Sequence, residues 1–450
     1  FITATTGVSW PKKIKKRIKS PPIECCGPML DAGATSHTND DNRTKKAGKK
    51  RPRSVDKPNG TRDNHPSSPL PSKPPPQTTG YGHSYGPFGR CSDVSERYAK
   101  LDRIGEGTYG IVYRARDKLT NEIVALKRCL PHHESTDGFP LTTLRELTLL
   151  REFAEEENRH PNIVLLRDVA VSSHRSGVFL VFDYAEHDLA NLIDVHYEMN
   201  SCSPFKESEV KRLLLQLLSA LSYLHSRHVL HRDLKLSNLL YTHSGELRLA
   251  DFGLARKVSL RTACPNTLTT DAHTTSRSRT ILTPKVVSLW YRPPEILFGS
   301  ETYDEGCDNW GAGCVFAELL TGVPLNKGQN ELEQVSNMFE LLGPPDSKSW
   351  PELDTLPLIK NGSVTIPSRT QGNGHGFRRG TTTGKGKSLS DRLHQLSPEG
   401  FKLVSSFLTY NSKRRISAKD ASRSAYFQEM PFPTNRTLMP TFPTLHNKPR

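Results

Sequence analysis

The chain has 450 residues, and its 62 Lys and Arg outnumber its 47 Asp and Glu, so its formal net charge is +15. The apolar fraction of 34%, even with the 31 glycines added, is below the usual share of a wholly globular chain, so part of the chain is expected not to fold. No stretch approaches the roughly 18 consecutive apolar residues of a membrane span, and residues 1–10 lack the layout of a signal peptide, so no membrane partner is expected. The eight cysteines form no CxxC pair, which argues against a zinc site or a disulfide framework and for a reducing compartment.

The excess positive charge is concentrated at the start of the chain. Residues 1–94 carry 17 Lys and Arg against 7 Asp and Glu, and 13 of the 33 prolines. Such a composition cannot bury enough apolar surface to offset chain entropy, so we predict a disordered, basic, Pro-rich tail over residues 1–95. Its basic runs, residues 12–19 and 45–53, are typical of nuclear import signals or of patches that bind polyanions; a merely solvated tail is the alternative. No aromatic residue lies within these runs, so base stacking is not expected, and any nucleic acid would be bound only through this tail.

From Tyr98 onward the apolar residues become periodic. Alternating or continuous apolar runs predict strands within residues 101–129 and over 178–182. Apolar residues at helical spacing predict helices over residues 141–153, 210–224 and 309–320. A small β-rich part is therefore followed by a larger helical part.

A glycine-rich run, GxGxxGxV, occupies residues 104–112. Glycines let backbone N–H groups approach phosphate oxygens, and flanking strands would make the loop a lid. A dinucleotide-binding loop shares this spacing, but there a helix follows the glycines, whereas here residues 111–115 have a strand pattern. A hairpin lid is therefore favoured, although the run alone is a weak signal.

Lys127 ends an apolar strand pattern, where a buried ammonium would need anionic partners. Glu146 on the next predicted helix can be one such partner, and nucleotide phosphates the other. Considered alone, a lysine that simply reaches water at a strand end is the commoner case.

A short polar cluster follows the apolar pair at residues 229–230. Phosphoryl transfer needs an acceptor for the proton of the incoming hydroxyl, a cation beside the transferred phosphate and metal ligands. Asp233, Lys235 and Asn238 supply these groups within six residues, and Asp251 of a DFG triplet supplies a second metal ligand 13 residues later. HRDxKxxN and DFG at this spacing form a strong and specific signal.

On these motifs, residues 98–427 resemble a eukaryotic protein kinase domain, and Lys235 resembles the serine/threonine-specific class. FPLTTLRE at residues 139–146 resembles the PITSLRE-type helix of the cyclin-dependent kinases, and residues 438–448 are similar to the tail of their kinase 10, so the branch of kinases 10 and 11 fits best. The resemblance implies an α+β bilobal fold, with a small antiparallel β-rich N-lobe at about 98–185 and a larger helical C-lobe at about 186–427. Residues 428–450 would form a C-terminal extension.

The resemblance also implies an ATP and Mg²⁺ site. Asp233, Lys127, Lys235 and Glu146 would be the catalytic residues, and Asn238 and Asp251 would hold Mg²⁺. The residues implied to bind ATP lie on the glycine loop, the adjoining strands, the connection between the lobes and the floor of the site: Ile104, Gly105, Glu106, Gly107, Thr108, Tyr109, Gly110, Val112, Ala125, Lys127, Phe182, Asp183, Tyr184, Ala185, Asp188 and Leu240.

Regulation is implied by the same resemblance. A cyclin would dock on the helix that carries Glu146 and turn Glu146 toward Lys127. Val286 and Val287 would form an apolar seat for the proline that follows a target Ser or Thr. The residues implied in phosphoregulation are the acceptor Thr283, the arginines that would bind its phosphate, and two inhibitory sites on the phosphate lid: Thr283, Arg145, Arg232, Arg256, Thr108 and Tyr109.

The sequence departs from the family at several places. The 31 residues between Asp251 and Thr283 are about twice the usual number, and we interpret residues 259–281 and 360–388 as surface insertions. Pro293 replaces an alanine of the APE motif, and Asn411 stands where an aspartate is usual. None of these changes touches the catalytic residues, so regulation is expected to be affected and not chemistry.

Three hypotheses follow. The first is a cyclin-dependent, proline-directed serine/threonine kinase that acts on Ser/Thr-Pro sites of proteins in cell-cycle or transcription control, located in the nucleus, with a cytoplasmic fraction left open. The second is a catalytically weak, kinase-like scaffold that binds a cyclin. The third is a nucleic-acid-binding protein that acts through its basic tail.

Overall fold

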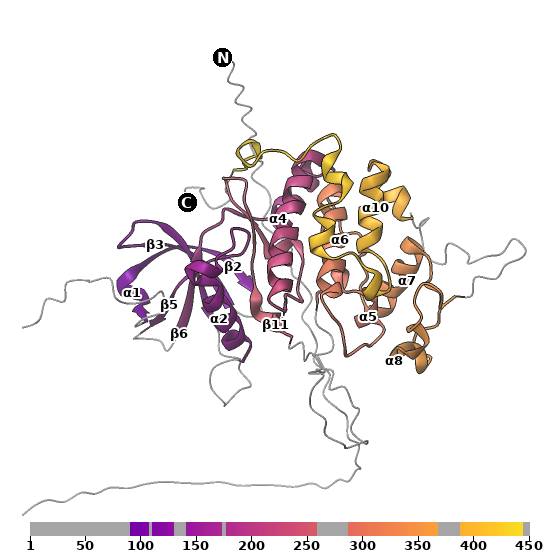
Figure 1. Ribbon diagram of the computed structural model, residues 1–450. Helices are drawn as coiled ribbons and strands as arrows, with labels where there is room; N and C mark the ends of the chain where they lie inside the picture. The colour runs from indigo at the N-terminus through magenta and orange to yellow at the C-terminus, as the bar shows by residue number, and fades with distance from the viewer. Residues whose placement is uncertain are drawn as a thin grey trace, which may run out of the picture. The chain divides into compact units, whose positions relative to one another are not determined.

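A computed structural model describes residues 91–107, 110–129, 141–172, 177–258, 287–367 and 388–443 (Figure 1). The N-lobe is built on a six-stranded sheet with the order β1-β5-β6-β4-β3-β2, in which all neighbours are antiparallel except β1 and β5. Its strands are β1 (Ser92–Asp93), β2 (Tyr98–Gly107), β3 (Gly110–Asp117), β4 (Ile123–Cys129), β5 (Leu166–Ser172) and β6 (Gly177–Asp183). The strands predicted within residues 101–129 and over 178–182 are confirmed.

The folded part begins earlier than predicted. Ser92 pairs with Ala170 of β5, and Asp93 caps the short helix α1 (Val94–Arg97) by accepting the backbone N–H of Ser95. Val94 is buried in the N-lobe core beside Leu126. The predicted tail boundary at residue 95 is therefore wrong, since the folded part already includes β1 and the first residues of α1. The physical reason is that Val94 buries its apolar side chain in that core. Residues 1–90 lie outside the described residues, so disorder there stays a prediction.

One helix covers the sheet and links it to the C-lobe. This helix, α2 (Leu141–Ala154), packs against β5, and its buried Phe153 contacts Phe252 with ring centroids 5.7 Å apart. The predicted helix over 141–153 is confirmed. Because Phe252 belongs to the DFG triplet, α2 and that triplet are in direct contact.

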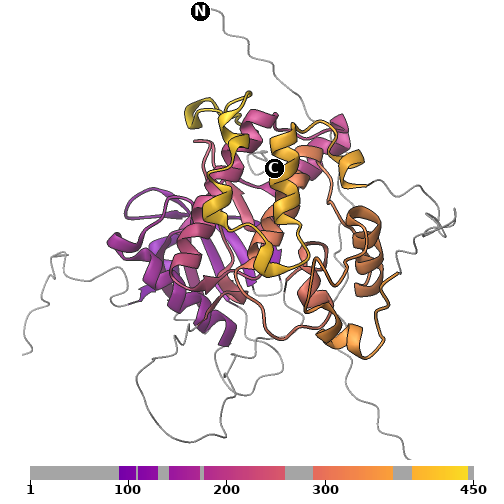
Figure 2. The ribbon, with the colours of Figure 1, turned by 45° about the vertical axis from the view of Figure 1, so that its right-hand side comes forward.

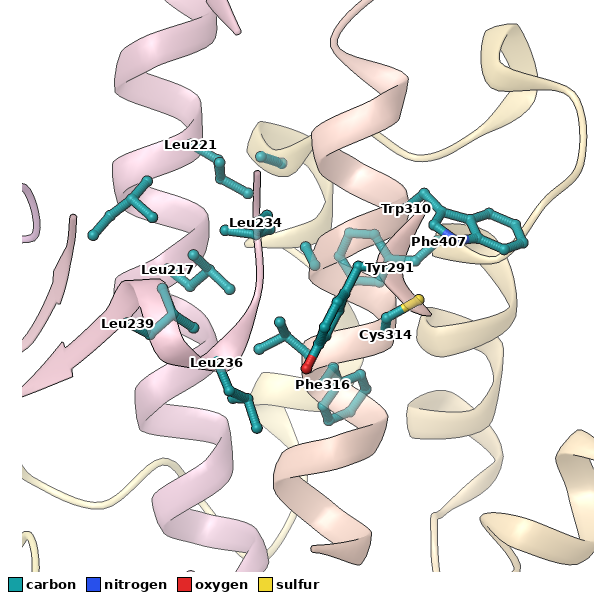
Figure 3. Packing of buried hydrophobic residues seen from close by; sticks show 14 of the residues in the cluster. Leu217, Leu221, Leu234, Leu236, Leu239, Tyr291, Trp310, Cys314, Phe316 and Phe407 are labelled. Carbon is teal, nitrogen blue, oxygen red and sulfur yellow. The ribbon is translucent and has the colours of Figure 1, made fainter. Parts of the chain in front are cut away.

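The C-lobe core lies between two long helices, α4 (Glu207–Ser226) and α6 (Gly306–Thr321), which confirm the helices predicted over 210–224 and 309–320. Figure 3 shows Leu217 and Leu221 of α4 and Phe316 of α6 directed into this core. A Cβ at Gly313 would lie 2.6 Å from Cβ of Phe407, so glycine there allows α6 and α10 to pack closely. α6 is buried along almost its whole length, which suits a central scaffold for the site.

The remaining elements surround that core, and Figure 2 shows them from a second direction. The short strands are β7 (His187–Asp188), β8 (Val229–Leu230), β9 (Leu239–Tyr241), β10 (Leu247–Leu249) and β11 (Arg256–Lys257). The helices are α3 (Leu189–Asn200), α5 (Pro294–Leu297), α7 (Glu331–Leu342), α8 (Pro357–Lys360), α9 (Leu389–Arg392), α10 (Pro398–Phe407) and α11 (Ala418–Ala421), and the 3-10 turns used below are η2 (Leu236–Asn238), η3 (Phe252–Leu254) and η7 (Ala425–Gln428).

The predicted insertions fall mostly on residues that the structure does not describe. Residues 259–286 and 368–387 lie outside the described residues. Residues 361–367 continue from α8, and Val364 is buried in the C-lobe core, so this part of the predicted insertion belongs to the domain. Among the helices that the structure describes, none is long and apolar enough to span a membrane.

Candidate active site

The glycine-rich segment is the turn of an antiparallel hairpin. β2 and β3 pair through Gly105 with Val112 and Gly107 with Gly110, so a strand follows the turn. This geometry excludes the dinucleotide-binding alternative, in which a helix follows the glycines. A Cβ at Gly110 would overlap the carbonyl oxygen of Arg128 on β4, so the close pairing of β3 and β4 requires glycine here.

Lys127 lies between two carboxylates. Its Nζ is 2.7 Å from Glu146 Oε1 on α2 and 3.2 Å from Asp251 Oδ1, directly before η3. Burial alone lowers the pKa of Lys127, but the two carboxylates outweigh burial and raise this pKa above its ordinary value. Burial raises the pKa of Asp251, yet the nearby ammonium of Lys127 lowers it overall, so both groups stay charged. The pairing expected from the sequence is present, and the alternative of a lysine that simply reaches water is excluded.

A buried carboxylate fixes the loop that contains the polar cluster. Asp308 on α6 accepts the backbone N–H of His231 at 2.9 Å and that of Arg232 at 2.8 Å, and His225 Nε2 lies 3.0 Å from it. Burial raises the pKa of Asp308, but these donors lower it overall, so the carboxylate stays ionised. Arg232 has a φ of 65°, which non-glycine residues rarely adopt, and Asp308 stabilises that conformation.

Asp233 is the centre of a hydrogen-bonded group. Lys235 Nζ donates to its Oδ2 at 2.6 Å, and Asn238 Nδ2 donates to the same oxygen at 3.1 Å. Ser288 donates to Oδ1 through its hydroxyl at 2.8 Å and through its backbone N–H at 3.2 Å. Both carboxylate oxygens are therefore held in place. A carboxylate oriented in this way can accept a proton from a hydroxyl, and the adjacent ammonium can stabilise charge on a transferred phosphoryl group.

Asn238 and Asp251 have the chemistry that Mg²⁺ prefers. Asn238 Nδ2 donates to the carbonyl and the carboxylate of Asp233, so its amide oxygen is the atom left for a cation. Ala250 N–H donates to the carbonyl of Asn238 at 2.9 Å, which brings the next residue, Asp251, to its side. The Asp251 side chain is 31% exposed. One carboxylate and one amide oxygen suit a magnesium ion that is shared with nucleotide phosphates, and within the part of the chain that the structure describes no larger metal-binding cluster is found.

Apolar residues from both lobes flank this group. They are all half-buried and come from β2, β3, β4 and β9: Ile104, Val112, Ala125 and Leu240. Phe182 on β6 is buried and pairs with Ala125 across the strands. These residues have the character needed for the walls of an adenine site.

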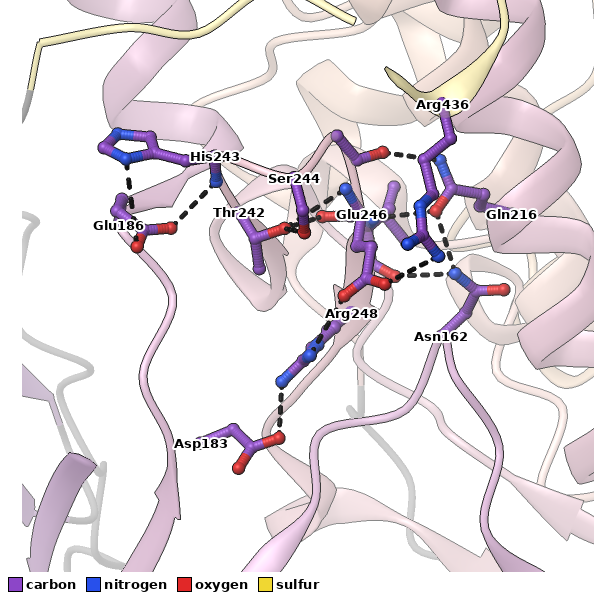
Figure 4. A network of polar contacts seen from close by, with 12 residues as sticks. Asn162, Asp183, Glu186, Gln216, Thr242, His243, Ser244, Glu246, Arg248 and Arg436 are labelled. Atoms are coloured by element: carbon purple, nitrogen blue, oxygen red, sulfur yellow. Dashed lines mark hydrogen bonds and ion pairs between the residues drawn. The ribbon is translucent and has the colours of Figure 1, made fainter. Parts of the chain in front are cut away.

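The connection between the lobes carries two carboxylates with defined partners. Asp183 forms ion pairs with Arg167 and, at 2.6 Å, with Arg248 (Figure 4). Its side chain is therefore occupied, and Asp183 can contribute to nucleotide binding only through its backbone. Asp188 accepts the backbone N–H of Asn191 at 2.8 Å, which orients its carboxylate at the start of α3. Ala185 lies between them and is half-buried.

Arg232 is held by neutral partners in this structure. Its Nε donates to the carbonyl of Leu254 at 2.7 Å, and its guanidinium donates to the hydroxyl of Tyr303 at 2.9 Å. Arg256 lies on β11 and pairs with Leu230 of β8, which is two residues before Arg232 in the sequence. Arg145 is exposed on α2.

Several predicted residues lie outside the described part of the chain. These are Thr283, Val286, Thr108 and Tyr109, together with the side chain of Glu106. The convergence of the three arginines on phosphorylated Thr283 and the inhibitory sites on the lid therefore stay predictions.

The base of the segment after Thr283 is fixed by a buried ion pair. Arg415 donates to both carboxylate oxygens of Glu295, at 2.9 and 3.0 Å, and both residues are buried. The unusual Asn411 is also buried, and its side chain accepts the backbone N–H of Lys413 at 3.0 Å. Pro293 directly precedes α5. Neither departure disturbs the buried ion pair.

The contacts of two further residues, Ser288 and Arg292, are not predicted from the sequence. Ser288 contacts Asp233 across 55 residues of sequence. Arg292 donates to the carbonyl of Val287 through Nε at 3.2 Å and through a terminal guanidinium nitrogen at 3.0 Å. Serine and arginine are common surface residues, and no spacing rule connects them to the catalytic loop, so only the folded chain reveals their partners.

The glycine hairpin, the Lys127–Glu146 pair and the group around Asp233 together define a protein kinase. The protein kinase domain family matches residues 98–427. Cyclin-dependent kinase 10 of Homo sapiens and of Rattus norvegicus is 42% identical over 361 residues, which cover 80% of this chain and 88% of each relative. Cyclin-dependent kinase 11B of Rattus norvegicus is 41% identical over 355 residues, 78% of this chain and 71% of that protein.

Among solved structures, one chain of the yeast RNA Pol II CTD kinase CTDK-1 complex superposes with a TM-score of 0.60 at 31% identity, and the match covers 81% of this chain and 100% of that chain. The chain therefore belongs to the protein kinase family and, within it, to the cyclin-dependent kinases. It is a serine/threonine protein kinase, and the predicted bilobal α+β fold is confirmed.

Proposed function

We propose that this chain is a cyclin-dependent, proline-directed kinase that transfers the γ-phosphate of ATP to Ser or Thr followed by Pro. In this proposal Asp233 accepts the proton of the substrate hydroxyl, and Lys235 stabilises the transferred phosphoryl group. Lys127, oriented by Glu146, contacts the nucleotide phosphates. Asn238 and Asp251 hold Mg²⁺, which supplies positive charge to those phosphates when bound.

The preference for proline rests on the backbone of Val287. This buried valine has a φ of 70°, a conformation that costs energy for a β-branched residue. Its carbonyl oxygen accepts both hydrogen bonds from Arg292 described above. Val287 directly precedes Ser288, which contacts Asp233, so it lies where the residue after the acceptor would pass. A peptide N–H there would find this carbonyl already occupied, whereas proline has no N–H to satisfy.

The test compares phosphate transfer to Ser-Pro and Ser-Ala peptides, with Asp233→Asn as the blank. A lost partner for one buried N–H predicts a preference for Ser-Pro of about tenfold or more in kcat/KM. Arg292→Ala frees the Val287 carbonyl, so the preference should shrink. Glu331→Gln is the matched control, because it removes only the 2.7 Å ion pair on the other side of Arg292. Equal rates on both peptides would contradict the proposed specificity.

Control by a cyclin is supported by the relatives, whose names describe cyclin-dependent kinases, and by the surface of α2. Leu144 on α2 is 42% exposed, and it lies nine residues, or about two and a half helical turns, before the buried Phe153, so the two side chains are on opposite sides of the helix. An exposed leucine on this helix suits an apolar partner surface. Transfer that requires an added cyclin would support this control; no transfer above the blank with a cyclin that binds would favour the scaffold hypothesis.

A role in transcription or cell-cycle control in the nucleus is the remaining part of the proposal. It is supported by the basic runs at residues 12–19 and 45–53 and by the structural relative, which is described as an RNA Pol II CTD kinase complex. Fluorescent full-length chain should concentrate in nuclei, and neutralising both runs should abolish this. Loss of salt-dependent RNA binding in the same variant would support nucleic-acid contact through the tail.

A further inference from the structure

The residues after η7 cross the C-lobe and end beside the connection between the lobes. Figures 1 and 2 show them in yellow, passing over α4. We call residues 429–443 the C-terminal segment. It contains four prolines, Pro431, Pro433, Pro440 and Pro443, which have no N–H, so its backbone offers fewer N–H donors than carbonyl acceptors.

The first half of the C-terminal segment is fixed to α4 through such carbonyls. Lys211, whose side chain is fully buried, donates to the carbonyl of Glu429 at 3.1 Å. Arg212 donates to the carbonyl of Thr434 at 2.5 Å, and the N–H of Thr434 donates to the carbonyl of Ser208 at 2.9 Å. A lysine without solvent exposure is costly unless its ammonium has fixed partners, so this contact is a built anchor.

The second half is held by residues of β7, of β9 and of the turn that follows β9. Tyr241 on β9 donates to the carbonyl of Pro440 at 2.6 Å. Nε2 of His187 and Nε2 of His243 lie 3.2 and 3.1 Å from the carbonyl oxygen of Phe442. Because a carbonyl only accepts, both ring nitrogens must donate. The ring of Phe442 packs edge-on against His187, Tyr241 and Phe205, with centroids 6.1, 6.1 and 5.5 Å away.

These contacts lie one residue from the nucleotide site. In the β7–β9 pair, His187 lies opposite Tyr241, and the next pair is Asp188 opposite Leu240. Asp188 and Leu240 are both among the residues implied above to bind ATP, and Leu240 is one of the apolar residues that flank the site. The position of this strand pair is therefore set on one side by Phe442.

A second route joins the C-terminal segment to the connection between the lobes (Figure 4). Arg436 pairs with Glu246 at 2.8 Å, Glu246 with Arg248 at 3.0 Å, and Arg248 with Asp183 at 2.6 Å. Gly245, at the turn between β9 and β10, has a φ of 75°, and a Cβ there would lie 2.5 Å from the carbonyl oxygen of Arg436, so the turn and the segment are in close contact.

We propose that the C-terminal segment is a positioning element of the nucleotide site: seated through Phe442, it holds the β7–β9 pair so that Asp188 and Leu240 are placed to bind ribose and adenine. The inference rests on the proposed function only in requiring that this site binds nucleotide. It adds residues of the extension, outside the matched kinase domain, to the determinants of ATP affinity.

The test measures binding of a non-hydrolysable ATP analogue with Mg²⁺ to the full chain by calorimetry, together with KM for ATP and kcat. Phe442→Ala should raise the Kd of the analogue and KM for ATP by about fivefold or more, with a smaller change in kcat. Tyr241→Phe removes only the hydroxyl bond to Pro440, so it should also raise the Kd of the analogue and KM for ATP, but by a smaller factor. Phe432→Ala is the matched control, because Phe432 belongs to the same segment but is 60% exposed, and it should bind the analogue as the unaltered chain does.

A folded Phe442→Ala chain with unchanged Kd would overturn the proposal, and so would an equal rise in Phe432→Ala. If Phe442→Ala does not fold, the Tyr241→Phe variant tests the proposal instead. An unchanged Kd of the analogue in Tyr241→Phe would also overturn the proposal. The binding measurement uses the chain without cyclin or peptide, whereas the tests of the proposed function measure phosphate transfer, so failure of this inference and failure of the proposed function give different results.

Discussion

Ser288 shows how much a single hydroxyl contributes to the catalytic group. It donates to Asp233 at 2.8 Å and accepts from Lys235 at 3.2 Å, so it links the carboxylate of Asp233 to the ammonium beside it. A hydroxyl that bridges two charged groups fixes the position of both. Its contribution should therefore appear in turnover more than in stability.

Replacement of Ser288 by Ala should lower kcat by about 10- to 100-fold, the equivalent of one lost hydrogen bond to a charged group. Ser288→Thr keeps the hydroxyl and should retain most of the activity. The measurement is steady-state transfer to a Ser-Pro peptide at saturating ATP, with thermal unfolding as the check on folding. If the Ala variant turned over at the unaltered rate, the group around Asp233 would not need this residue.

Glu318 is a buried carboxyl group on α6. Tyr291 donates its hydroxyl to Glu318 Oε2 at 2.6 Å. Burial, reinforced by the negative charge of Asp194, raises the pKa of Glu318 to about 7. An unfolded glutamate has a pKa of about 4.3, so between these values the folded state binds the proton more tightly than the unfolded state. The stability that this proton supplies is present at low pH and is lost as the pH rises through 7.

The variant Glu318→Gln cannot ionise and keeps an oxygen acceptor for Tyr291. The free energy of unfolding of the variant minus that of the unaltered chain should therefore increase from pH 5 to pH 8, by up to about 3 kcal/mol. Urea unfolding at several pH values measures this difference. Parallel pH profiles for the two chains would mean that Glu318 titrates in its ordinary range.

At the scale of elements, α2 has two faces with different tasks. One face brings Glu146 to Lys127 and Phe153 to Phe252, so it joins the sheet to the catalytic loop. Leu144 lies away from these contacts and is 42% exposed. A partner bound at Leu144 could therefore stabilise the inward position of α2 without entering the active site.

Leu144→Asp should leave the fold intact, with a thermal midpoint within about 2 °C of the unaltered chain, because surface substitutions rarely cost more than about 0.5 kcal/mol. It should nevertheless abolish activation by a cyclin, since a charge would be buried at the contact. Co-purification with the cyclin and peptide phosphorylation measure the two effects, and Leu119→Asp, at an exposed leucine of the β3–β4 turn, is the control. Full activation of Leu144→Asp would place the cyclin elsewhere.

At the scale of the whole molecule, the folded domain begins with residues that look like part of the tail. Ser92 donates to Asp168 at 2.8 Å, and Arg97 forms ion pairs with Asp117 and Asp168. Asp117 and Asp168 are buried, so removal of Arg97 would leave two buried carboxylates without their cation.

A chain of residues 91–450 should therefore match the full chain in thermal midpoint and in turnover of short peptides. A chain of residues 98–450, which begins at the matched domain boundary, should be less stable by about 2–3 kcal/mol, or about 5 °C, since it loses Val94 burial and the Arg97 pairs. Differential scanning calorimetry compares the three chains. Equal midpoints for the two shortened chains would show that β1 and α1 are dispensable.

The sequence by itself determined the class of the protein, and it predicted most of the residues that the structure brings together around Asp233 and Lys127. Asp233, Lys235 and Asn238 lie within one short loop, and Lys127 ends a strand, so the order and spacing of residue types along the chain were enough to predict them. The long helices α4 and α6 could be predicted as well, because apolar periodicity is a local property of the sequence and does not depend on how the helices pack.

Only the tertiary structure decided which distant groups complete the site. Ser288 reaches Asp233 across 55 residues, and Phe442 reaches His187 across 255. The left-handed backbone of Val287 depends on packing that no local pattern encodes. The sequence places Val94 in the tail because one apolar residue among polar neighbours gives no periodic signal. In the structure Val94 is buried in the core of the N-lobe. Contacts between residues far apart in sequence depend on how the elements pack, and packing is a property of the whole folded chain.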